Sequence, residues 1–456
     1  MGISSVLSTP KRMLFVIVAA ALLIRLVLMP LLTYDFDIYH WALIISNINS
    51  GNNLYNLDGY YYTPVWGYML GFIQLIEQFF VDNGMMAERF TSMLDIENLQ
   101  YPYHIATVTS IGFNILMKIP LILCDIAVGY LIYWLVKDRT GSEKKAVYGL
   151  AFWLFCPVVI YMASVQAMFD TFSALLFLLS VILFYKGKYF VGGAMFSTVV
   201  LLKFFPAFSI FVLLAYVLLK HKNDGLAKRK VLEAVAGMTI MAVILMAPLI
   251  LNGQFGDAFM FVFGRVGDGA PLGKGMMMAS LIALGSMFYF GYRMYFRTSV
   301  EDADKKLFFY ILLTATASVL ISAAPQYVII VMPFLILQMI AVDRSYFKLW
   351  VIIGTAACLG AIAFNNLSLF SALSAYTGII TPEWIISGMR LFETNVLGTN
   401  VHILTIIITQ GTQYVGTLLI LAFGLSEIVK RRIPVLTDLL MRVMKWGTKE
   451  VSDDES

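Results

Sequence analysis

The chain has 456 residues, of which 60% are apolar and 13% are charged, and its formal net charge is +4. Soluble globular domains carry about 25% charged residues, so this composition excludes that class and indicates an integral membrane protein with many spans. The three cysteines lie in apolar runs without CxxC or Cys/His spacing, which argues against a disulfide framework and a structural metal site.

The first predicted element is an apolar run over residues 13–33 that contains one charge, Arg25. About 21 residues at 1.5 Å each cover roughly 32 Å, the thickness of a bilayer core. Because Arg25 interrupts the run and no small-residue cleavage site follows it, we expect a membrane anchor rather than a cleaved signal peptide.

The segment 34–109 follows the first span and is predicted to lie outside. It is too long for a simple connector and is half apolar. Residues 38–48 and 65–80 show helical periodicity with aromatic residues, which predicts two amphipathic helices along the outer interface. The aromatic run 60–64, YYYTP, fits an aromatic belt at the headgroup level as well as a binding role.

Lys and Arg are distributed unevenly, and this unevenness predicts the topology. By the positive-inside rule, the loops that hold the basic clusters are cytoplasmic. The clusters are Lys11/Arg12, Lys137/Arg139/Lys144/Lys145, Lys186/Lys188, residues 220–230, residues 293–306, Arg344/Lys348 and Lys430/Arg431/Arg432. The loops between them hold few basic residues and are predicted to face outward.

The predicted fold class is all-α: a polytopic membrane bundle of about 12 transmembrane helices with both termini inside. The spans are expected near residues 13–33, 110–136, 146–164, 170–185, 189–203, 205–219, 231–251, 275–292, 307–322, 326–342, 349–365 and 404–429. Residues 1–429 form one transmembrane domain, and residues 430–456 form a cytoplasmic tail.

Polar residues stand near the outer ends of several predicted spans. Lys118 and Asp125 share one face of the second span, Gln166 and Asp170 flank an outer turn, and Lys203 lies at a helix break. An ionised side chain at mid-membrane costs about 2.5–3.5 kcal/mol on insertion scales. We therefore expect a polar cavity that opens to the outside. Asp125 lies deeper and is predicted to be structural, pairing with a neighbouring polar group.

Five motifs resemble the polytopic, lipid-donor glycosyltransferases of the GT-C superfamily, in particular their bacterial and archaeal mannosyltransferase-like branch. They are DFDIY followed by YYYTP, MKIPLILCD, FCPVVIYMASVQAMFD, LLKFFP and, more weakly, AAPQYVIIVMPFL. Together they cover about residues 13–340 in the family's order. Val165 stands where the family usually has a glycine, and Val65 where it has a second proline.

The resemblance implies an inverting transfer of a sugar, with mannose favoured, from a polyprenyl or dolichyl phosphate donor to an acceptor hydroxyl on the outer face. The reaction needs one carboxylate as general base, because the phosphate is a good leaving group that requires no general acid. Asp35 and Asp37 both fit this role by position. We favour Asp35, four residues before Tyr39, on the family's spacing.

The substrate-binding candidates are Tyr39, His40, Tyr62, Lys118, Gln166, Asp170, Lys203, Arg265, Gln326 and Tyr327. Lys118 and Lys203 can bind the donor phosphate as point charges, or they snorkel to the lipid headgroups. Asp170 with Gln166 can orient the sugar, or they are a polar helix start.

Arg265 lies in a Gly-rich outer loop that either covers the donor or is solvated. No two of the four histidines have metal-ligand spacing, so we assign no metal and no cofactor, while a divalent metal stays open. The expected partners are the lipid-phosphate sugar, an acceptor that is a glycolipid, a lipid-linked oligosaccharide or a protein, and membrane lipids. No nucleic acid is expected.

The alternative function is a secondary transporter or flippase of a sugar or lipid-linked sugar, because buried Asp and Lys residues among many spans also describe transporters. The chain lacks the internal repeat of such proteins. A third possibility is an assembly subunit of a larger membrane complex. The predicted location is the plasma membrane with the site facing outside, or the endoplasmic reticulum membrane in a eukaryote.

Overall fold

The computed structural model describes residues 9–51, 54–56, 60, 62–87, 90–93, 107–256, 273–322, 324–396 and 398–429. Helices account for most of this part of the chain, and its strands form two small two-stranded antiparallel sheets. The all-α prediction is confirmed.

The N-terminal elements are α2 (Pro10–Leu28), α3 (Asp35–Asn49), η1 (Leu54–Asn56), α4 (Pro64–Asp82), β1 (Phe90–Met93), β2 (Thr107–Thr109), α5 (Ile111–Thr140), α6 (Glu143–Leu154), α7 (Pro157–Tyr161), η2 (Met162–Gln166), α8 (Asp170–Tyr185) and α9 (Tyr189–Val200). They are followed by η3 (Phe205–Ser209), α10 (Ile210–Lys220), α11 (Ala227–Leu251), α13 (Gly273–Phe296), α14 (Ala303–Val319), η4 (Pro325–Ile330), α15 (Met332–Ala341), α16 (Tyr346–Asn365), η5 (Asn366–Phe370), α17 (Ser371–Thr377), α18 (Pro382–Glu393), β3 (Asn395–Val396), β4 (Thr399–Asn400) and α19 (Val401–Val429).

Each predicted spanning segment overlaps at least one of these helices, and the segment 146–164 covers the broken series α6, α7 and η2. The helices predicted at 38–48 and 65–80 are α3 and α4. Within the described residues, four helices, α5, α11, α16 and α19, are long and apolar enough to cross a membrane. A fifth span results if α6 and the segment Pro157–Gln166, which bend by 53°, are counted as one. The protein therefore has several apolar helices of membrane-spanning length, while the number of about twelve spans stays a prediction.

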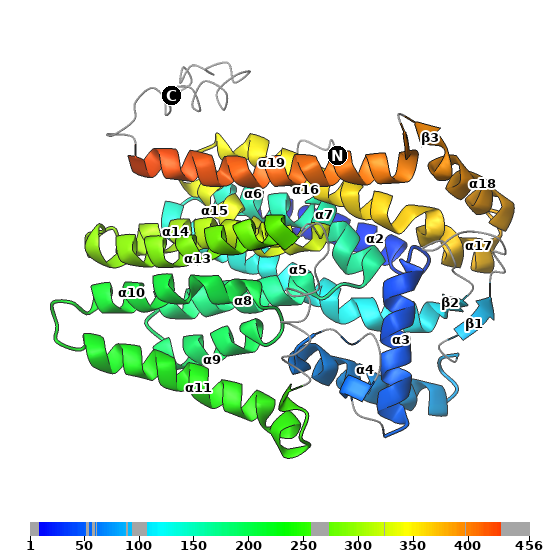
Figure 1. Ribbon diagram of the computed structural model, residues 1–456, viewed down its shortest axis with the longest axis horizontal. Helices are drawn as coiled ribbons and strands as arrows, with labels where there is room; N and C mark the ends of the chain where they lie inside the picture. Colours follow the sequence, from blue (N-terminus) through cyan, green and yellow to red (C-terminus); the bar gives the residue numbers. More distant parts are fainter. Residues whose placement is uncertain are drawn as a thin grey trace.

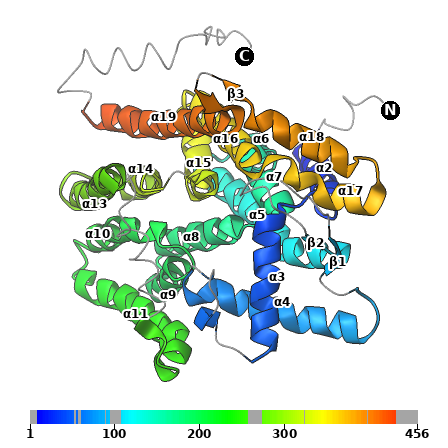
Figure 2. The same ribbon diagram turned by 45° about the vertical axis from the view of Figure 1, so that its right-hand side comes forward.

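The long helices run side by side, and α3 runs across them (Figure 1). The α10–α11 connection lies at one end of this bundle, and α17 and α18 lie at the other (Figure 1). The same crossing of α3 is seen from a second direction in Figure 2. The helices α5 and α8 both start on the side of the bundle where α3 crosses it (Figure 1). The polar motifs of the sequence therefore gather near α3.

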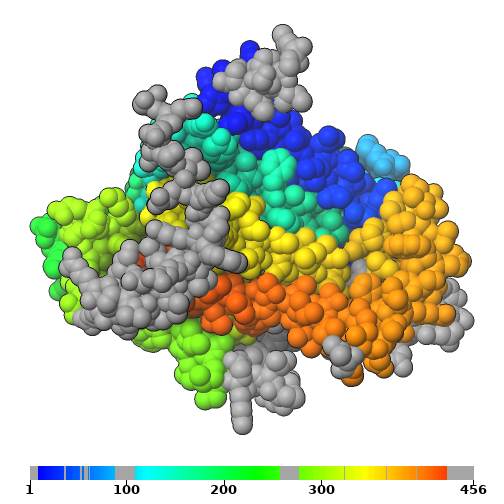
Figure 3. Space-filling view, turned by 90° about the horizontal axis from the view of Figure 1, so that it is seen from above, coloured from blue at the N-terminus to red at the C-terminus, as the bar shows by residue number. Residues whose placement is uncertain are grey.

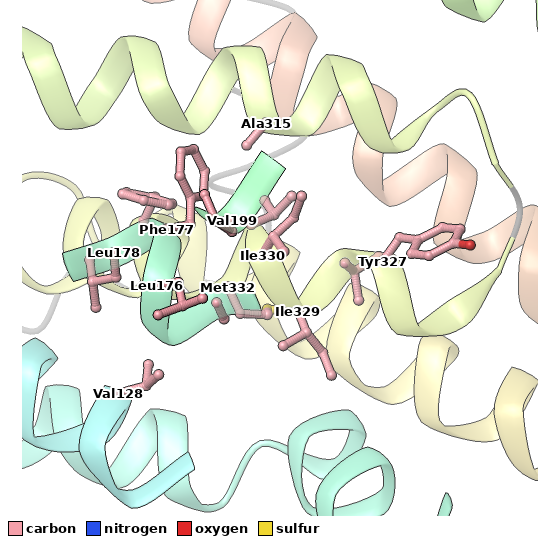
Figure 4. Packing of buried hydrophobic residues seen from close by; sticks show 14 of the residues in the cluster. Val128, Leu176, Phe177, Leu178, Val199, Ala315, Tyr327, Ile329, Ile330 and Met332 are labelled. Carbon is pink, nitrogen blue, oxygen red and sulfur yellow. The ribbon is translucent and has the colours of Figure 1, made fainter. Parts of the chain in front are cut away.

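The core lies between α5, α8, η4 and α14. Figure 4 shows Leu176, Phe177, Val199, Ile330 and Met332 in the space between Val128 on one side and Ala315 on the other. Helix α8 is apolar on all sides and almost wholly buried, as expected for a helix at the centre of a bundle. Tyr327 lies at the margin of this cluster, and its hydroxyl points away from the apolar side chains (Figure 4).

The outer surface of the bundle is apolar. Helix α19 lies along the face seen in Figure 3, next to α16. Its exposed side chains include Ile403, Ile407, Ile408 and Val415. Large exposed apolar patches are rare on soluble proteins but are expected where a helix faces lipid.

Helices α9 and α11 approach each other closely because glycines face their neighbour's backbone. A Cβ atom on Gly193 would lie 2.1 Å from the Ala234 carbonyl oxygen, and one on Gly237 would lie 2.0 Å from that of Phe190. Small residues at helix contacts are typical of membrane bundles, where backbones rather than bulky side chains pack together.

A buried ion pair joins α2 to α5. Arg25 Nε contacts Asp125 Oδ2 at 2.5 Å, and both side chains are fully buried. The guanidinium also donates to the carbonyl oxygens of Ala21 (3.0 Å) and Leu154 (2.9 Å). The prediction that Asp125 pairs with a neighbouring polar group is confirmed. The charge of Arg25 in the first apolar run is neutralised inside the protein.

Candidate functional site

The site begins with a break in the helix that carries the motif FCPVVIYMASVQAMFD. Pro157 starts α7, and the following residues Met162–Gln166 form a π-helical turn. Ala167 then adopts φ 57°, the one positive φ found at a non-glycine among the described residues. Single π-turns and left-handed non-glycine residues both cost energy and are frequent at functional sites. Here they end the helix directly after Gln166.

Gln166 reaches a carboxylate that is far away in the sequence. Its Nε2 atom donates to Asp37 Oδ2 over 2.8 Å. Asp37 lies in the first turn of α3, the helix that crosses the end of the bundle. The contact therefore connects the acidic motif after the first span to the broken helix, and it brings two predicted site residues together.

A second charged contact lies beside the first. Lys203 Nζ contacts Asp170 Oδ1, and both side chains are almost fully buried. Asp170 is the first residue of α8, and Lys203 stands in the break between α9 and η3. The ammonium group also lies 4.7 Å from the ring centroid of Phe169 and 4.6 Å from that of Tyr327, within range for cation–π attraction.

These two contacts share an electrostatic environment. Lost hydration raises the pKa of Asp37 to about 7, although part of its side chain stays accessible. The nearby Asp170 raises this pKa further, while the hydrogen bond from Gln166 and the charge of Lys203 lower it. Asp37 is therefore poised between its neutral and ionised forms near neutral pH, as a general base requires.

Aromatic rings form one wall of the cluster. The Phe169 ring lies 4.9 Å from that of Tyr62 and stacks on Trp66 at 4.6 Å. Trp41, one turn after Asp37, lies 5.7 Å from Tyr62. The Nε1 atoms of Trp41 and Trp66 are buried and lack a hydrogen-bond partner in the described part of the chain. Tyr62 of the YYYTP run is thus part of the aromatic wall of the cluster.

Several other buried polar atoms of the cluster lack a partner. They are Ser164 Oγ, Gln166 Oε1 and Asp170 Oδ2, as far as the described residues extend. Leaving a buried donor or acceptor unsatisfied costs about 1–3 kcal/mol, so native proteins rarely do so without a reason. Two of these residues lie in the π-turn η2 and the third starts α8, and such unsatisfied atoms close together in the chain indicate a place where a polar ligand binds.

Lys118 makes a different set of contacts. Its Nζ atom donates to the carbonyl oxygens of Met29 (2.9 Å) and Leu32 (2.8 Å) and to Thr33 Oγ1 (2.8 Å). These groups form the end of α2, where a cation stabilises unpaired carbonyls. Snorkelling to the headgroups is wrong for both lysines, because Lys118 is fully buried and Lys203 is 5% exposed. The contacts of Lys118 give its predicted role at the donor phosphate no structural support.

The remaining candidates differ in what the structure says of them. Tyr39 and His40 lie in α3 and are partly exposed, and Gln326 is partly exposed in η4 beside Tyr327. The backbone of Asp35 starts α3, but its side chain lies outside the described residues, as does Arg265.

Two residues that the sequence analysis missed lie beside this cluster. Asn365 Nδ2 donates to the Tyr161 hydroxyl over 2.7 Å, although the two residues are 204 positions apart. In the sequence, Tyr161 is one more aromatic residue in an apolar run, and Asn365 is a polar residue at the end of a predicted span. The signal that could have found Asn365 is the Asn-Asn pair at the end of this otherwise apolar helix.

An apolar cavity of about 380 Å³ lies on the other side of the Lys203 segment. It is lined by side chains of α9, η3, α11 and α13, among them Phe196, Phe204, Met238 and Leu284. Lys203 is buried against Asp170, whereas the adjacent Phe204 is 49% exposed and faces the cavity. One short segment thus separates a charged cluster from an apolar space.

No three His, Cys, Asp or Glu side chains of the described residues are grouped so that they could hold a metal ion. No protein-family model matches the chain, and no curated protein is significantly similar to it in sequence.

Proposed function

We propose that the protein is an inverting membrane glycosyltransferase that uses a polyprenyl or dolichyl phosphate sugar as donor and an acceptor hydroxyl on the outer face. The observation that carries this proposal is the convergence of Asp37, Gln166, Asp170 and Lys203 from separate helices. The order of the motifs, which resembles that of GT-C enzymes, supports the same reaction and favours mannose as the sugar.

In this proposal Asp37 is the general base. It takes the proton of the acceptor hydroxyl while the acceptor oxygen attacks the anomeric carbon, and the bond from that carbon to the phosphate oxygen breaks. The lipid phosphate leaves with the electron pair of that bond, so one displacement inverts the anomeric configuration. The hydrogen bond from Gln166 fixes the orientation of the carboxylate for this step.

Lys203 and the apolar cavity suit the two halves of such a donor. The ammonium group of Lys203 can stabilise charge that develops on the leaving phosphate, and Asp170 and two aromatic rings hold it in position. The cavity lined by Phe204 can accept the apolar chain of the lipid, which water would otherwise surround. This arrangement fits a multi-pass protein of about twelve spans with its site facing outside.

A transporter of a sugar or lipid-linked sugar is the second candidate. Broken helices around buried charges, as at η2 and η3, also form the substrate sites of transporters. The two functions differ in whether a new glycosidic bond is made.

The test is an assay of the purified protein in lipid nanodiscs with a radiolabelled polyprenyl-phosphate mannose and native membrane lipid. We expect Asp37→Asn to lower turnover by about 100-fold or more, the usual effect of removing a general base. Asp35→Asn is measured in the same assay. The matched control is Asp82→Asn at the exposed end of α4, for which we expect unchanged turnover. Full activity of Asp37→Asn would contradict the assignment, and uptake without transfer by wild type would favour the transporter.

A further inference from the structure

We infer that Tyr161 and Asn365 form a subsite for one hydroxyl group of a carbohydrate ligand, next to Asp37. The inference rests on the proposed function and adds a recognition element to the same site. Tyr161 is the last residue of α7 and Asn365 is the last residue of α16. Their side chains are joined at 2.7 Å, and the residues are 6% and 1% exposed.

Two independent observations place this pair beside Asp37. Tyr161 lies within electrostatic range of the Asp37 carboxylate. The amide of Thr33, just before α3, donates to the Leu369 carbonyl oxygen over 3.1 Å, which holds the turn after α16 against the start of α3.

The π-turn explains why Tyr161 and Gln166 serve the same site. They are five residues apart, which is one hydrogen-bonded turn of a π-helix, so both side chains leave the same face. In a regular α-helix, residues at this spacing point in clearly different directions. The strained backbone at Ala167 therefore has a use, because it permits the turn that aligns Tyr161 with the residue that holds Asp37.

The hydrogen-bonding groups that the pair leaves unused match a hydroxyl. Asn365 Oδ1 is a buried acceptor without a partner among the described residues. The Tyr161 oxygen accepts from Asn365, and its own proton is available to donate. Exchange of the amide nitrogen and oxygen would again leave one donor and one acceptor.

A ligand hydroxyl can accept a hydrogen bond from Tyr161 and donate one to Asn365 at the same time. An ionised phosphate cannot, because its oxygens only accept, and the nearby Asp37 carboxylate would repel it. This chemistry separates the pair from Lys203, which suits an anion. We assign the subsite to a sugar hydroxyl of the donor or acceptor.

The test measures binding rather than turnover, so that it does not depend on finding the full reaction. The protein in nanodiscs is titrated with octyl α-mannoside and with its 2-, 3-, 4- and 6-deoxy analogues. For wild type we expect one deoxy analogue to bind about tenfold more weakly, equivalent to about 1.4 kcal/mol. Tyr161→Phe and Asn365→Ala are expected to bind the parent glycoside as weakly as that analogue and to lose the discrimination.

The matched control is Tyr216→Phe, which removes another buried tyrosine hydroxyl, one bonded to Asp304 at 2.8 Å. It should keep the wild-type discrimination. If folded Tyr161→Phe discriminates as wild type does, the pair is structural and the inference is wrong; equal binding of all analogues by wild type also overturns it. If Tyr161→Phe does not fold, Asn365→Ala decides. Discrimination without any transfer activity would keep the subsite and reject the transferase.

Discussion

At the scale of single residues, Asp37 combines a fixed orientation with an unusual acidity. The hydrogen bond from Gln166 holds one carboxylate oxygen, and lost hydration keeps the proton on the group up to about pH 7. A base of this kind accepts a proton readily near neutral pH. Its environment stabilises the neutral form, so ionisation of Asp37 lowers the free energy of unfolding of the protein.

This cost predicts a dependence on pH. Because the pKa of Asp37 in the folded protein is about 7, above the ordinary value of about 3.9, wild type loses stability as the pH rises between these values, and the whole loss is present above pH 7. Asp37→Asn should therefore raise the apparent melting temperature at pH 8, with a smaller gain at pH 4. Wild-type transfer should fall about tenfold per pH unit below 7. An equal gain at both pH values would contradict this account.

The Lys203–Asp170 pair gives a second prediction at this scale. Removing one partner of a buried ion pair leaves an uncompensated charge and costs about 3–5 kcal/mol. Lys203→Met and Asp170→Asn should each destabilise the protein by about this amount, and the double variant by clearly less than their sum. Denaturation of the purified variants measures both effects.

The control is the partly exposed Lys230–Glu233 pair at the surface, where Lys230→Met should leave the free energy of unfolding almost unchanged. Additive losses in the Lys203 and Asp170 variants would show that the two groups do not interact.

The sequence predicted several of these residues but not how they pair. Asp37, Gln166, Asp170 and Lys203 stood out because polar groups in apolar runs are costly. Their pairing depends on where helices break, and the contacting residues are up to 129 positions apart. Tyr161 could not be identified, because a tyrosine in an apolar run is ordinary until its partner is known.

At the scale of elements, α9 and α11 pack closely because glycines on each helix face the backbone of the other. Gly237→Ala would place a Cβ atom 2.0 Å from the Phe190 carbonyl oxygen, so α11 must move away. We expect a loss of about 1–3 kcal/mol, typical of overpacking. Gly285→Ala is the control: a Cβ atom there meets nothing within 4 Å, and the variant should gain up to about 1 kcal/mol from helix propensity. Equal effects of the two variants would contradict the close contact.

The elements themselves were largely predictable, because each apolar run between basic clusters forms a helix. Their lengths were not. Helix α8 has 16 residues and α9 has 12, shorter than a full span, because both begin or end at the polar cluster. The breaks at η2, η3 and η4 place Gln166, Lys203 and Tyr327 together, and no periodicity in the sequence marks where a helix turns into the site.

At the scale of the whole molecule, the distribution of charge fits one functional end. The described basic loops, such as that between α10 and α11, lie at the opposite end of the bundle from α3, α17 and α18 (Figure 1). The polar cluster lies at the α3 end, and we propose from the positive-inside rule that this end is the outer one. A glycosyltransferase with a lipid-linked donor needs this arrangement, since both substrates meet at one membrane surface.

The most direct test of this account is the anomeric configuration of the product. Wild-type protein is incubated in nanodiscs with a β-linked polyprenyl-phosphate mannose and native membrane lipid, and the new glycosidic bond is examined by NMR. The account predicts an α-linked product from wild type and almost none from Asp37→Asn. A β-linked product, or no glycosidic product from wild type with any lipid-phosphate sugar, would contradict it.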